Sequence, residues 1–558
     1  MRTNGLPTTK LRCKSWANFA QTLKRISRAY CKNTGLHGFQ YIVRGETTFE
    51  RIIWLMVCTS SVFFCVTLML RLWQYYSDNP IVTTIDTTNP VSELHFPGVT
   101  ICNNNKVFKP HADNIAKELL MKGFDNSMSN KLFSSLMKLI RPDRMKIDNG
   151  TATRALDILG YTVEKLMFEL MQPCNLLLAR CSWLGQLYDC SKIFKTVKSN
   201  EGFCCGFNYH FDLFNDYNKE YPWLIKVTNN SLDLNSSEPL PGVETILQVP
   251  GTGHDIGLAV ALNVDVKNYK SSVRQFVGAT VLIHDPLDYP DIGAQSATLQ
   301  PGHVMSVTLG GTKIKSSENI RSIPLRKRMC LFDDETPGER KYSYRTCISE
   351  CTHRKLYGSC GCLPFFYPKD HPSDRTCYLT DMDCILTRMR SLSREELRDC
   401  KCLPQCNDKS YEMVSESVAL SNVEFESELT RGLDVKQMSF LYIYFRDGTF
   451  LEYRKRTILG WDNLLAAFGG IFGLCLGGSV ISLVEFLYYL VKDFISVRKV
   501  KREQRNLPAA SKLFISVPAN MDLDKYSKSN LYGRTLLEWD HPQPGRKCPD
   551  LKLNMYYE

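Results

Sequence analysis

Residues 464–491 read LLAAFGGIFGLCLGGSVISLVEFLYYLV, an apolar run without lysine or arginine. The run is long enough to cross a bilayer, for which a helix needs about 20 residues. A helix that only anchors a protein has no use for five glycines and would avoid an acid such as Glu485. Ionisable residues inside a membrane usually face a bundle interior or a water-filled path. The run therefore predicts a pore-lining helix.

A second apolar segment, Ile52–Leu70, is also long enough to span, and about 390 residues separate it from the first. Residues 1–51 carry ten lysines and arginines against two acids, and residues 498–505 are also basic. The positive-inside rule then places both termini in the cytoplasm and the middle outside. The net charge of +11 is interpreted as membrane-surface charge and not as nucleic-acid binding.

The predicted fold class is an α+β membrane protein with two transmembrane helices and a large disulfide-rich extracellular domain. The predicted domains are a cytoplasmic N-terminus (1–51), a first span (52–72), the extracellular domain (73–460), a second span (461–491) and a cytoplasmic tail (492–558). Apolar residues at helical spacing predict helices at His111–Gly123 and Gly160–Met171. Alternating, β-branched-rich sequence predicts strands at Thr245–Val249, Gly257–Val266, Gly278–His284 and Val304–Leu309.

Cysteine usage agrees with this topology, because 16 of the 22 cysteines lie between the spans. An even number at high density in an oxidising compartment predicts a disulfide framework. Three glycosylation sequons also fall on the predicted outside, at Asn149, Asn229 and Asn235.

The late cysteines have informative spacing. Cys347 and Cys351 are about one helical turn apart, and Cys400 and Cys402 would be similarly spaced on an extended segment. A helix could therefore face that segment with two successive disulfides, although spacing alone does not select this pairing. Zinc is the competing interpretation of such spacing, but the oxidising side of a membrane favours disulfides.

Within the second span, Gly477, Gly478 and Ser479 could present oxygen atoms to a pore axis, because glycine lets backbone oxygen approach the axis and serine offers a hydroxyl. On a continuous helix, Glu485 lies two turns beyond Gly478. Further pore-lining candidates are Ala466, Gly470, Gly473, Ser482 and Glu485. The alternative is that Gly469, Gly473 and Gly477 form a stripe for close helix packing.

Several motifs resemble those of the degenerin/epithelial sodium channel family, most closely its insect pickpocket-type members. They are Thr34-Gly35-Leu36-His37-Gly38, Phe96-Pro97-Gly98-Val99-Thr100-Ile101-Cys102-Asn103, Glu201-Gly202-Phe203-Cys204-Cys205-Gly206-Phe207-Asn208, the ten cysteines from Cys330 to Cys406, and Gly477-Gly478-Ser479. The resemblance extends from about residue 35 to about residue 493.

The resemblance implies a homo- or heterotrimer with a β-core, a helical finger and a thumb in each subunit. It implies a sodium-selective, amiloride-sensitive, voltage-independent channel of the plasma membrane, with no cofactor besides the permeant ion. His37 and Gly38 match the family's gating motif, and Gly477, Gly478 and Ser479 match its selectivity filter, where carbonyl and hydroxyl oxygens would replace part of the hydration shell of sodium. The implied disulfides are Cys102–Cys204, Cys181–Cys190, Cys330–Cys406, Cys347–Cys402, Cys351–Cys400, Cys360–Cys384 and Cys362–Cys377.

Two cysteines, Cys174 and Cys205, are left over and are predicted to form an additional disulfide. Other functional classes are less well supported. An ecto-enzyme would need a catalytic motif, and none is recognisable in the sequence. An ATP-gated channel has a different cysteine pattern, and an adhesion receptor would not need a glycine-rich second span. The gating stimulus stays open, because acid, peptide, small molecule, mechanical force, osmolarity and constitutive opening all occur on the scaffold that the resemblance implies. Whether the chain binds an extracellular ligand also stays open.

Overall fold

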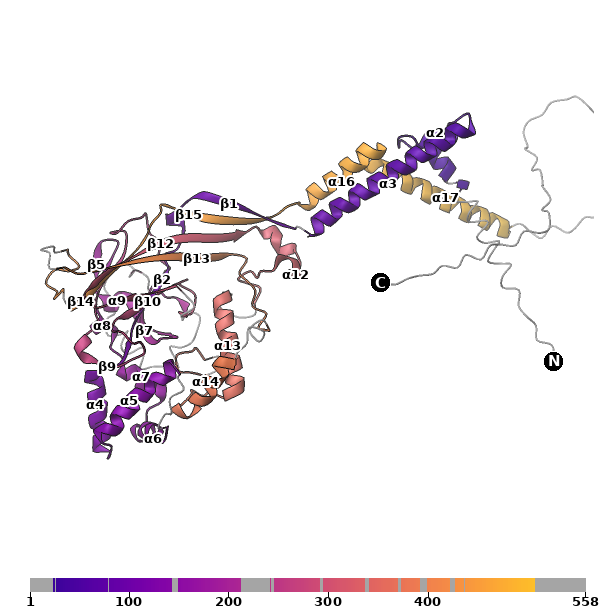
Figure 1. The fold of residues 1–558 in the computed structure, drawn as a ribbon. Coiled ribbons are helices and arrows are strands. Elements are labelled where there is room, and N and C mark those ends of the chain that lie inside the picture. Colours follow the sequence, from indigo (N-terminus) through magenta and orange to yellow (C-terminus); the bar gives the residue numbers. More distant parts are fainter. Residues whose placement is uncertain are drawn as a thin grey trace, which may run out of the picture. The chain divides into compact units, whose positions relative to one another are not determined.

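The computed structural model describes residues 24–506, apart from 26, 79, 143–148, 212–240, 242–244, 292–294, 337–340, 370–372, 392–398, 422–426 and 436. The chain divides into two compact units, residues 35–480 and residues 1–34 together with 481–558. The larger unit combines helices with two main sheets, as the predicted α+β class requires (Figure 1).

The helices are α2 (Phe39–Arg44), α3 (Thr48–Asp78), α4 (Lys109–Met121), α5 (Asn126–Ile140), α6 (Asn149–Leu159), α7 (Val163–Leu170), α8 (Cys174–Leu177), α9 (Cys190–Ile193), α12 (Leu325–Arg328), α13 (Tyr344–Cys360), α14 (Met382–Ser391), α16 (Trp461–Leu476) and α17 (Val480–Asn506). The strands are β1 (Ile81–Pro90), β2 (Gly98–Asn103), β3 (Asn105–Phe108), β4 (Leu178–Trp183), β5 (Gln186–Tyr188), β6 (Phe194–Ser199), β7 (Gly202–Phe207), β8 (Gly257–Asn263), β9 (Tyr269–Ser272), β10 (Ala279–His284), β11 (Gln295–Leu299), β12 (His303–Ser316), β13 (Asp408–Ala419), β14 (Met438–Phe445) and β15 (Thr449–Thr457).

The strands build a sandwich. The larger sheet has the order β1-β15-β12-β14-β8-β4-β5, with β13 paired to β12, and the smaller sheet has the order β11-β10-β2-β7-β6. Apolar side chains of both sheets form one core, including Ile101 of β2, Val260 of β8 and Leu441 of β14. Successive side chains of a strand point to opposite faces, so Cys102, next to Ile101, belongs to a second core.

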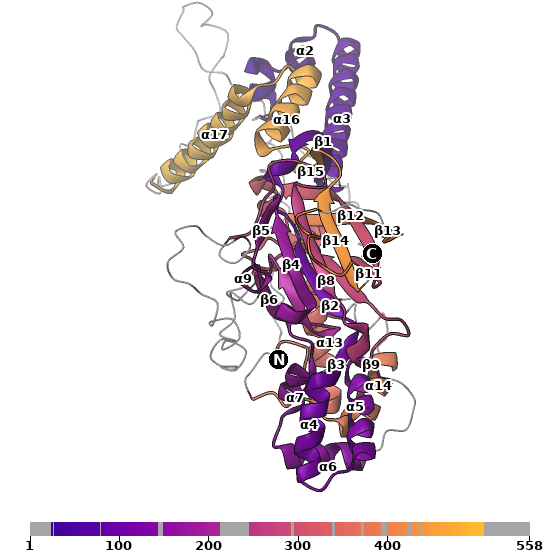
Figure 2. The ribbon, with the colours of Figure 1, turned by 90° about the vertical axis from the view of Figure 1, so that its left-hand side faces the viewer.

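This second core joins the small sheet to the helical part of the domain. It contains apolar residues of α4 to α7 and of the segment around α13 and α14, such as Leu119, Leu136, Leu166, Leu356 and Ile385. In Figures 1 and 2 these helices gather at the end of the domain that lies away from α3 and α16. The β-sandwich therefore stands between the helical layers and the predicted spans.

Most of the predicted elements are present. Helix α4 confirms His111–Gly123, α7 confirms Gly160–Met171, and β10 confirms Gly278–His284. The predicted strand Thr245–Val249 is wrong, because this segment contributes only an isolated bridge between Gln248 and His95. The strand predicted at Gly257–Val266 ends at Asn263, before a turn in which Asp265 has a left-handed backbone.

Two predictions about length and local conformation also need correction. Strand β12 runs well beyond Val304–Leu309, through Gly310 and Gly311. A Cβ at Gly311 would lie 2.1 Å from Leu94 Cδ2, so a glycine here allows close packing and does not mark a turn. Cys400 and Cys402 lie in a loop and not on an extended segment, because Lys401 between them has a φ of 51°.

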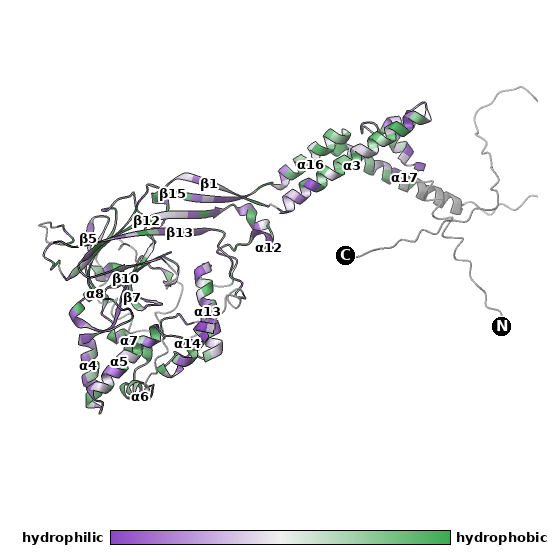
Figure 3. Ribbon diagram, in the orientation of Figure 1, coloured by the Kyte–Doolittle hydropathy of each residue, from purple (hydrophilic) through white to green (hydrophobic). Residues whose placement is uncertain are grey.

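Helix α3 is long and apolar enough to cross a membrane, and α16 together with Val480–Lys492 passes the same test as one broken span. Figure 3 shows apolar residues over most of α3 and α16. The chain leaves α3 into β1 and enters α16 from β15, and these two strands pair in antiparallel register from Ile81–Thr457 to Pro90–Thr449. The paired strands hold the C-terminal end of α3 and the N-terminal end of α16 together.

Candidate pore and gating segment

The second predicted span is broken at its glycines. Helix α16 ends at Leu476, Gly477 follows in the left-handed conformation with a φ of 63°, and α17 begins at Val480. Glycine is the usual residue at such a helix end, because it has no Cβ to oppose a positive φ. The three predicted filter residues therefore lie outside both helices, although the amide of Gly477 still bonds the carbonyl of Gly473 at the end of α16.

This break corrects the expectation of a continuous helix. The inference that Glu485 lies two turns beyond Gly478 on one face fails, because a helix end intervenes. Ala466, Gly470 and Gly473 do lie on α16, whereas Gly477 is its C-cap. Ser482 and Glu485 lie in the first turns of α17 and are half-buried.

The carbonyl groups at the end of α16 find specific partners. The last carbonyls of any helix lack intrahelical donors. Here the carbonyl of Gly473 accepts from the amide of Gly477 at 2.8 Å. The carbonyl of Cys475 accepts from the hydroxyl of Ser61 on α3 at 2.7 Å. The carbonyl of Leu476 accepts from the amide of His37 at 2.9 Å.

The predicted gating motif thus lies directly against the predicted filter. A Cβ added to Gly477 would meet the His37 ring at 2.2 Å from Cδ2. Gly38 is left-handed, with a φ of 82°, and a Cβ there would lie 2.8 Å from the sulfur of Cys58 on α3. Both glycines allow a close approach that no other residue would permit.

The remaining candidates on α16 face open space within the single chain. Ala466 and Gly470 are exposed, and Gly473 is half-buried. A Cβ added to Gly469 or Gly470 would have no atom within 4 Å. A row of small exposed residues on an apolar helix leaves room for close approach of another helix.

In the structure the sixteen cysteines between the two predicted spans form eight disulfides. They join the partners that the resemblance implies, together with Cys174–Cys205. Cys347 and Cys351 both lie on α13, one turn apart, and bond to Cys402 and Cys400. Sulfurs bonded to each other cannot act as thiolate ligands, which removes the zinc alternative for these residues. Asn149 is the first residue of α6, whereas Asn229 and Asn235 lie outside the described residues.

A cluster of acids occupies the junction between the sandwich and the start of α13. A cavity of about 120 Å³ is lined by Asp285, Asp288, Asp333 and Asp408, and also by lysines such as Lys409. Burial and the neighbouring Asp285 raise the pKa of Asp288 to about 7. Composition and periodicity gave no signal for this cluster, because its residues come from four separate segments.

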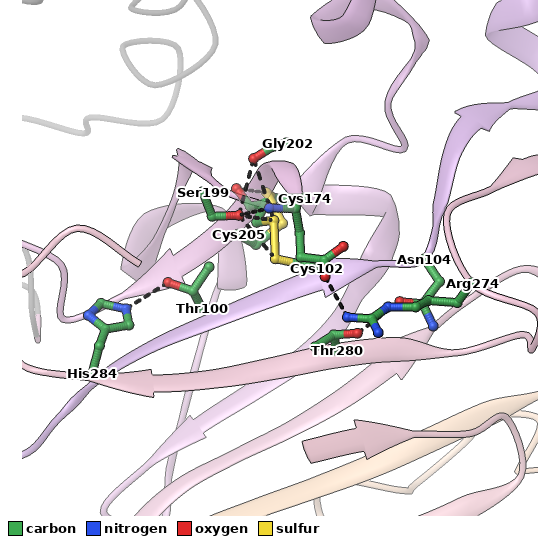
Figure 4. Close-up of a disulfide and its surroundings, with 12 residues drawn as sticks. Thr100, Cys102, Asn104, Cys174, Ser199, Gly202, Cys205, Arg274, Thr280 and His284 are labelled. Carbon is green, nitrogen blue, oxygen red and sulfur yellow. Dashed lines mark hydrogen bonds and ion pairs between the residues drawn. A yellow bond between two sulfur atoms is a disulfide. The ribbon is translucent and has the colours of Figure 1, made fainter. Parts of the chain in front are cut away.

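Two buried histidines lie nearby and are held neutral. Burial lowers the pKa of His284, whose ring lies 2.9 Å from the hydroxyl of Thr100 (Figure 4), to about 4. Burial also lowers the pKa of His353 on α13, stacked on Tyr367, to about 3. Neither belongs to a sequence motif, so the sequence pointed to neither of them.

Ser61 is a contact of the filter segment that the sequence analysis missed. Residues 52–70 contain four hydroxyl side chains, and these were the available signal, because polar side chains within spans commonly bond across helices. The partner, a backbone carbonyl of Cys475, could not be identified without the structure.

Comparison with known proteins finds relatives that match most of the chain. Pickpocket protein 28 of Drosophila melanogaster is 26% identical over 539 residues, covering 92% of this chain and 85% of the relative. Sodium channel protein Nach of Drosophila melanogaster is 24% identical over 482 residues, covering 84% of this chain and 88% of the relative. A solved proton-activated chloride channel matches with a TM-score of 0.24 at 8% identity, over 80% of this chain and 96% of that one. That likeness is too low to support an argument.

The family comparison covers all eight disulfides, the first predicted span and all but the last two residues of the second predicted span. The model of the amiloride-sensitive sodium channel family matches residues 30–489. That range extends from the helix before His37 through the filter segment to the first turns of α17. The chain therefore belongs to the amiloride-sensitive sodium channel family, a family of ion channels and not of enzymes.

Proposed function

We propose that this chain is a subunit of a sodium-selective, amiloride-blocked, voltage-independent channel of the plasma membrane. Residues 52–72 and 461–491 cross the membrane, residues 73–460 are extracellular, and both termini are cytoplasmic. Three subunits, identical or sister chains, surround one pore. The observation that carries the proposal is the break at Gly477–Ser479 within an otherwise apolar span.

The broken span supports the proposal because exposed backbone at membrane depth is costly. Irregular backbone is tolerated there only where it is buried in protein or lines a water-filled cavity. The carbonyls of Cys475 and Leu476 are already bonded to Ser61 and His37. The oxygens of Gly477, Gly478 and Ser479 come next in the chain and would line the axis, where they replace water around sodium.

The contact between His37 and the end of α16 supports a gating role for residues 37–38. The amide of His37 bonds the carbonyl next to the filter, so a movement of the N-terminal segment would pull on the filter directly. This coupling acts through a backbone hydrogen bond, so it requires no titrating side chain. Glu485 in α17 would attract cations on the inner side.

Electrical recording from cells that express the chain tests the proposal. We expect an inward current in external sodium that falls when sodium is replaced by N-methyl-D-glucamine, and that amiloride blocks. Surface biotinylation verifies that the chain reaches the plasma membrane. The proposal fails if a surface-expressed chain stays silent both alone and with sister subunits, under acid, peptide, osmotic and mechanical stimulation.

A further inference from the structure

A second polar cluster lies where the helical layer meets the small sheet. It contains Lys106 on β3, Arg141 at the C-cap of α5, Glu201 in the turn between β6 and β7, and Arg274 just after β9. Lys106 is 4% exposed and Glu201 is 0% exposed, so the centre of the cluster is fully buried. Figure 4 shows Arg274 close to Cys102 and Asn104, on a segment that neighbours β2.

Both arginines bond the same carboxylate oxygen. The Nη2 atoms of Arg141 and Arg274 each lie 2.6 Å from Oε1 of Glu201. Three buried polar atoms have no hydrogen-bond partner among the described residues: Lys106 Nζ, Arg274 Nε and Glu201 Oε2. A lysine ammonium carries three donors, and a buried polar group without a partner is expensive.

The charges of this cluster do not balance. Lys106, Arg141 and Arg274 face Glu201, which leaves an excess of positive charge. Burial and the two arginines lower the pKa of Lys106, whereas Glu201 raises it, and the result is about 8. Burial alone would raise the pKa of Glu201, but Lys106, Arg141 and Arg274 lower it overall. At neutral pH all four groups are therefore charged.

The sequence that follows Arg141 adds no net negative charge to balance the cluster. Residues 143–148, which follow Arg141 and lie outside the described residues, contain two acids and two bases. The two arginines reach solvent, so the group that most needs a partner is the buried ammonium of Lys106, which has no hydrogen-bond partner among the described residues.

We infer that this cluster binds a small monovalent inorganic anion, chloride in extracellular fluid, held by Lys106 Nζ and Arg274 Nε. A halide accepts hydrogen bonds from several directions and brings no donors that would need partners. A larger or doubly charged anion would be repelled by the carboxylate of Glu201. The side chains of Arg141 and Arg274 are 41% and 33% exposed, which gives the anion a route from solvent.

The anion would join two layers of the extracellular domain. Lys106 lies on β3 and Glu201 lies in the turn between β6 and β7, whereas Arg141 is the C-cap of helix α5. Chloride would therefore stabilise the attachment of the helical layer to the small sheet. This role is independent of ion selection in the membrane, so it stands or fails separately from the proposed channel function.

The test uses the purified full-length chain in detergent. Thermal stability is measured while sodium gluconate is replaced by sodium chloride at constant ionic strength. We expect a saturable rise with chloride and with bromide, and broadening of the chloride-35 NMR line. In Lys106→Met the apparent chloride affinity should fall at least roughly ten-fold, because a charged donor is lost. Lys117→Met, an exposed lysine on α4, should behave like the unmodified chain.

A second readout compares the thermal stability of Lys106→Met with that of the unmodified chain in each salt. A lysine with a purely structural role would give the same order of stability in both salts. In gluconate, Lys106→Met should be at least as stable as the unmodified chain, because it removes an uncompensated charge. In chloride the order should reverse. Equal stability of the unmodified chain in chloride and gluconate, with no line broadening, would overturn the inference. In that case Asp143→Asn should destabilise the chain, which would identify Asp143 as the counter-charge.

Discussion

Two left-handed glycines connect the N-terminal segment to the end of α16. Gly38 and Gly477 have φ values of 82° and 63°, and each packs where a Cβ would collide with a neighbour. The sequence marked both positions through motif resemblance. The physical reason, a close approach of two backbones, depends on His37 and Leu476 meeting across more than 400 residues of chain, which no local pattern encodes.

Gly477→Ala should sharply lower the sodium current at unchanged surface abundance. A non-glycine residue in the left-handed region costs about 1–2 kcal/mol, and the added methyl would lie 2.2 Å from the His37 ring. Gly469→Ala is the matched control, because a Cβ there meets no atom within 4 Å. Whole-cell current normalised to surface protein compares the two. Normal current in Gly477→Ala would contradict the packing described above.

Buried titratable residues predict how the stability of the disulfide-rich domain changes with acid. His284 and His353 have folded-state pKa values of about 4 and about 3, below the ordinary 6.5. Below pH 6.5 the unfolded chain binds more protons at these sites, so stability falls as the pH falls. Asp288, with a pKa of about 7 against an ordinary 3.8, acts in the opposite sense and stabilises the fold as the pH falls from 7 toward 4.

Asp288→Asn should therefore be more acid-sensitive than the unmodified chain. Between pH 6.5 and pH 5 the variant should lose roughly 2 kcal/mol more, since one titrating group contributes about 1.4 kcal/mol per pH unit. Denaturant unfolding of the full chain at both pH values gives the difference. Asp157→Asn, an exposed acid on α6, serves as the control. If the two variants lose stability equally between these pH values, Asp288 is not protonated in the folded chain at pH 5.

At the scale of elements, β7 is fixed on both of its faces. Cys204 and Cys205 are consecutive, so their side chains point in opposite directions. Cys204 belongs to the core shared with the helices and bonds Cys102 on β2, whereas Cys205 belongs to the sandwich core and bonds Cys174 on α8. The additional disulfide was predicted only because two cysteines were left over. The strand geometry supplies its structural reason.

Removing the Cys174–Cys205 disulfide should measurably destabilise the chain. The bond closes a loop with a sequence separation of 31, against 9 for Cys181–Cys190. Loop-closure entropy then predicts that the free energy of unfolding falls by roughly 3.5 kcal/mol when Cys174 and Cys205 are both changed to serine. It predicts a fall of roughly 2.5 kcal/mol when Cys181 and Cys190 are both changed to serine. Peptide mapping without reduction should recover the linked pair. Recovery of Cys174 as a thiol, or linked to Cys204, would show that the pairing is wrong.

Helix α16 carries the small residues that a closed pore would need. Ala466 is exposed in the single chain, one turn before Gly470 on the same helix face. In the proposed trimer a larger side chain would crowd the closed arrangement more than the open one, and so shift the population toward open. The length of the apolar run predicted this helix, whereas its end at Leu476 was missed, because apolar residues continue on both sides of the glycines.

Ala466→Val should raise the resting sodium current at unchanged surface abundance. Ala467→Val is the control, since it lies about 100° further round the helix. Both variants are compared by resting current before any stimulus and by the response afterwards. If Ala466→Val matches the unmodified chain in both, Ala466 does not line the closing pore.

At the scale of the whole molecule, hydropathy and cysteine spacing were enough to predict one apolar helix near the N-terminus, a disulfide-rich domain and a glycine-rich second span. The strand order was not predictable, because β12 pairs in parallel with both β14 and β15, which follow it by more than 120 residues. The acid cluster around Asp288 and the cation cluster around Lys106 could not be predicted from the sequence for the same reason. Each gathers single residues from several elements, and no periodicity links them.

The most direct measurement is the reversal potential of chains substituted at Ser479, recorded with sodium on one side and potassium on the other. Because the oxygens of Gly477–Ser479 are proposed to replace the water around sodium, bulky or non-hydroxylic residues at Ser479 should lower the sodium-to-potassium permeability ratio. Gly469→Ala should leave the ratio unchanged in the same recordings. If several bulky replacements at Ser479 preserve both the current and the permeability ratio, the filter lies elsewhere.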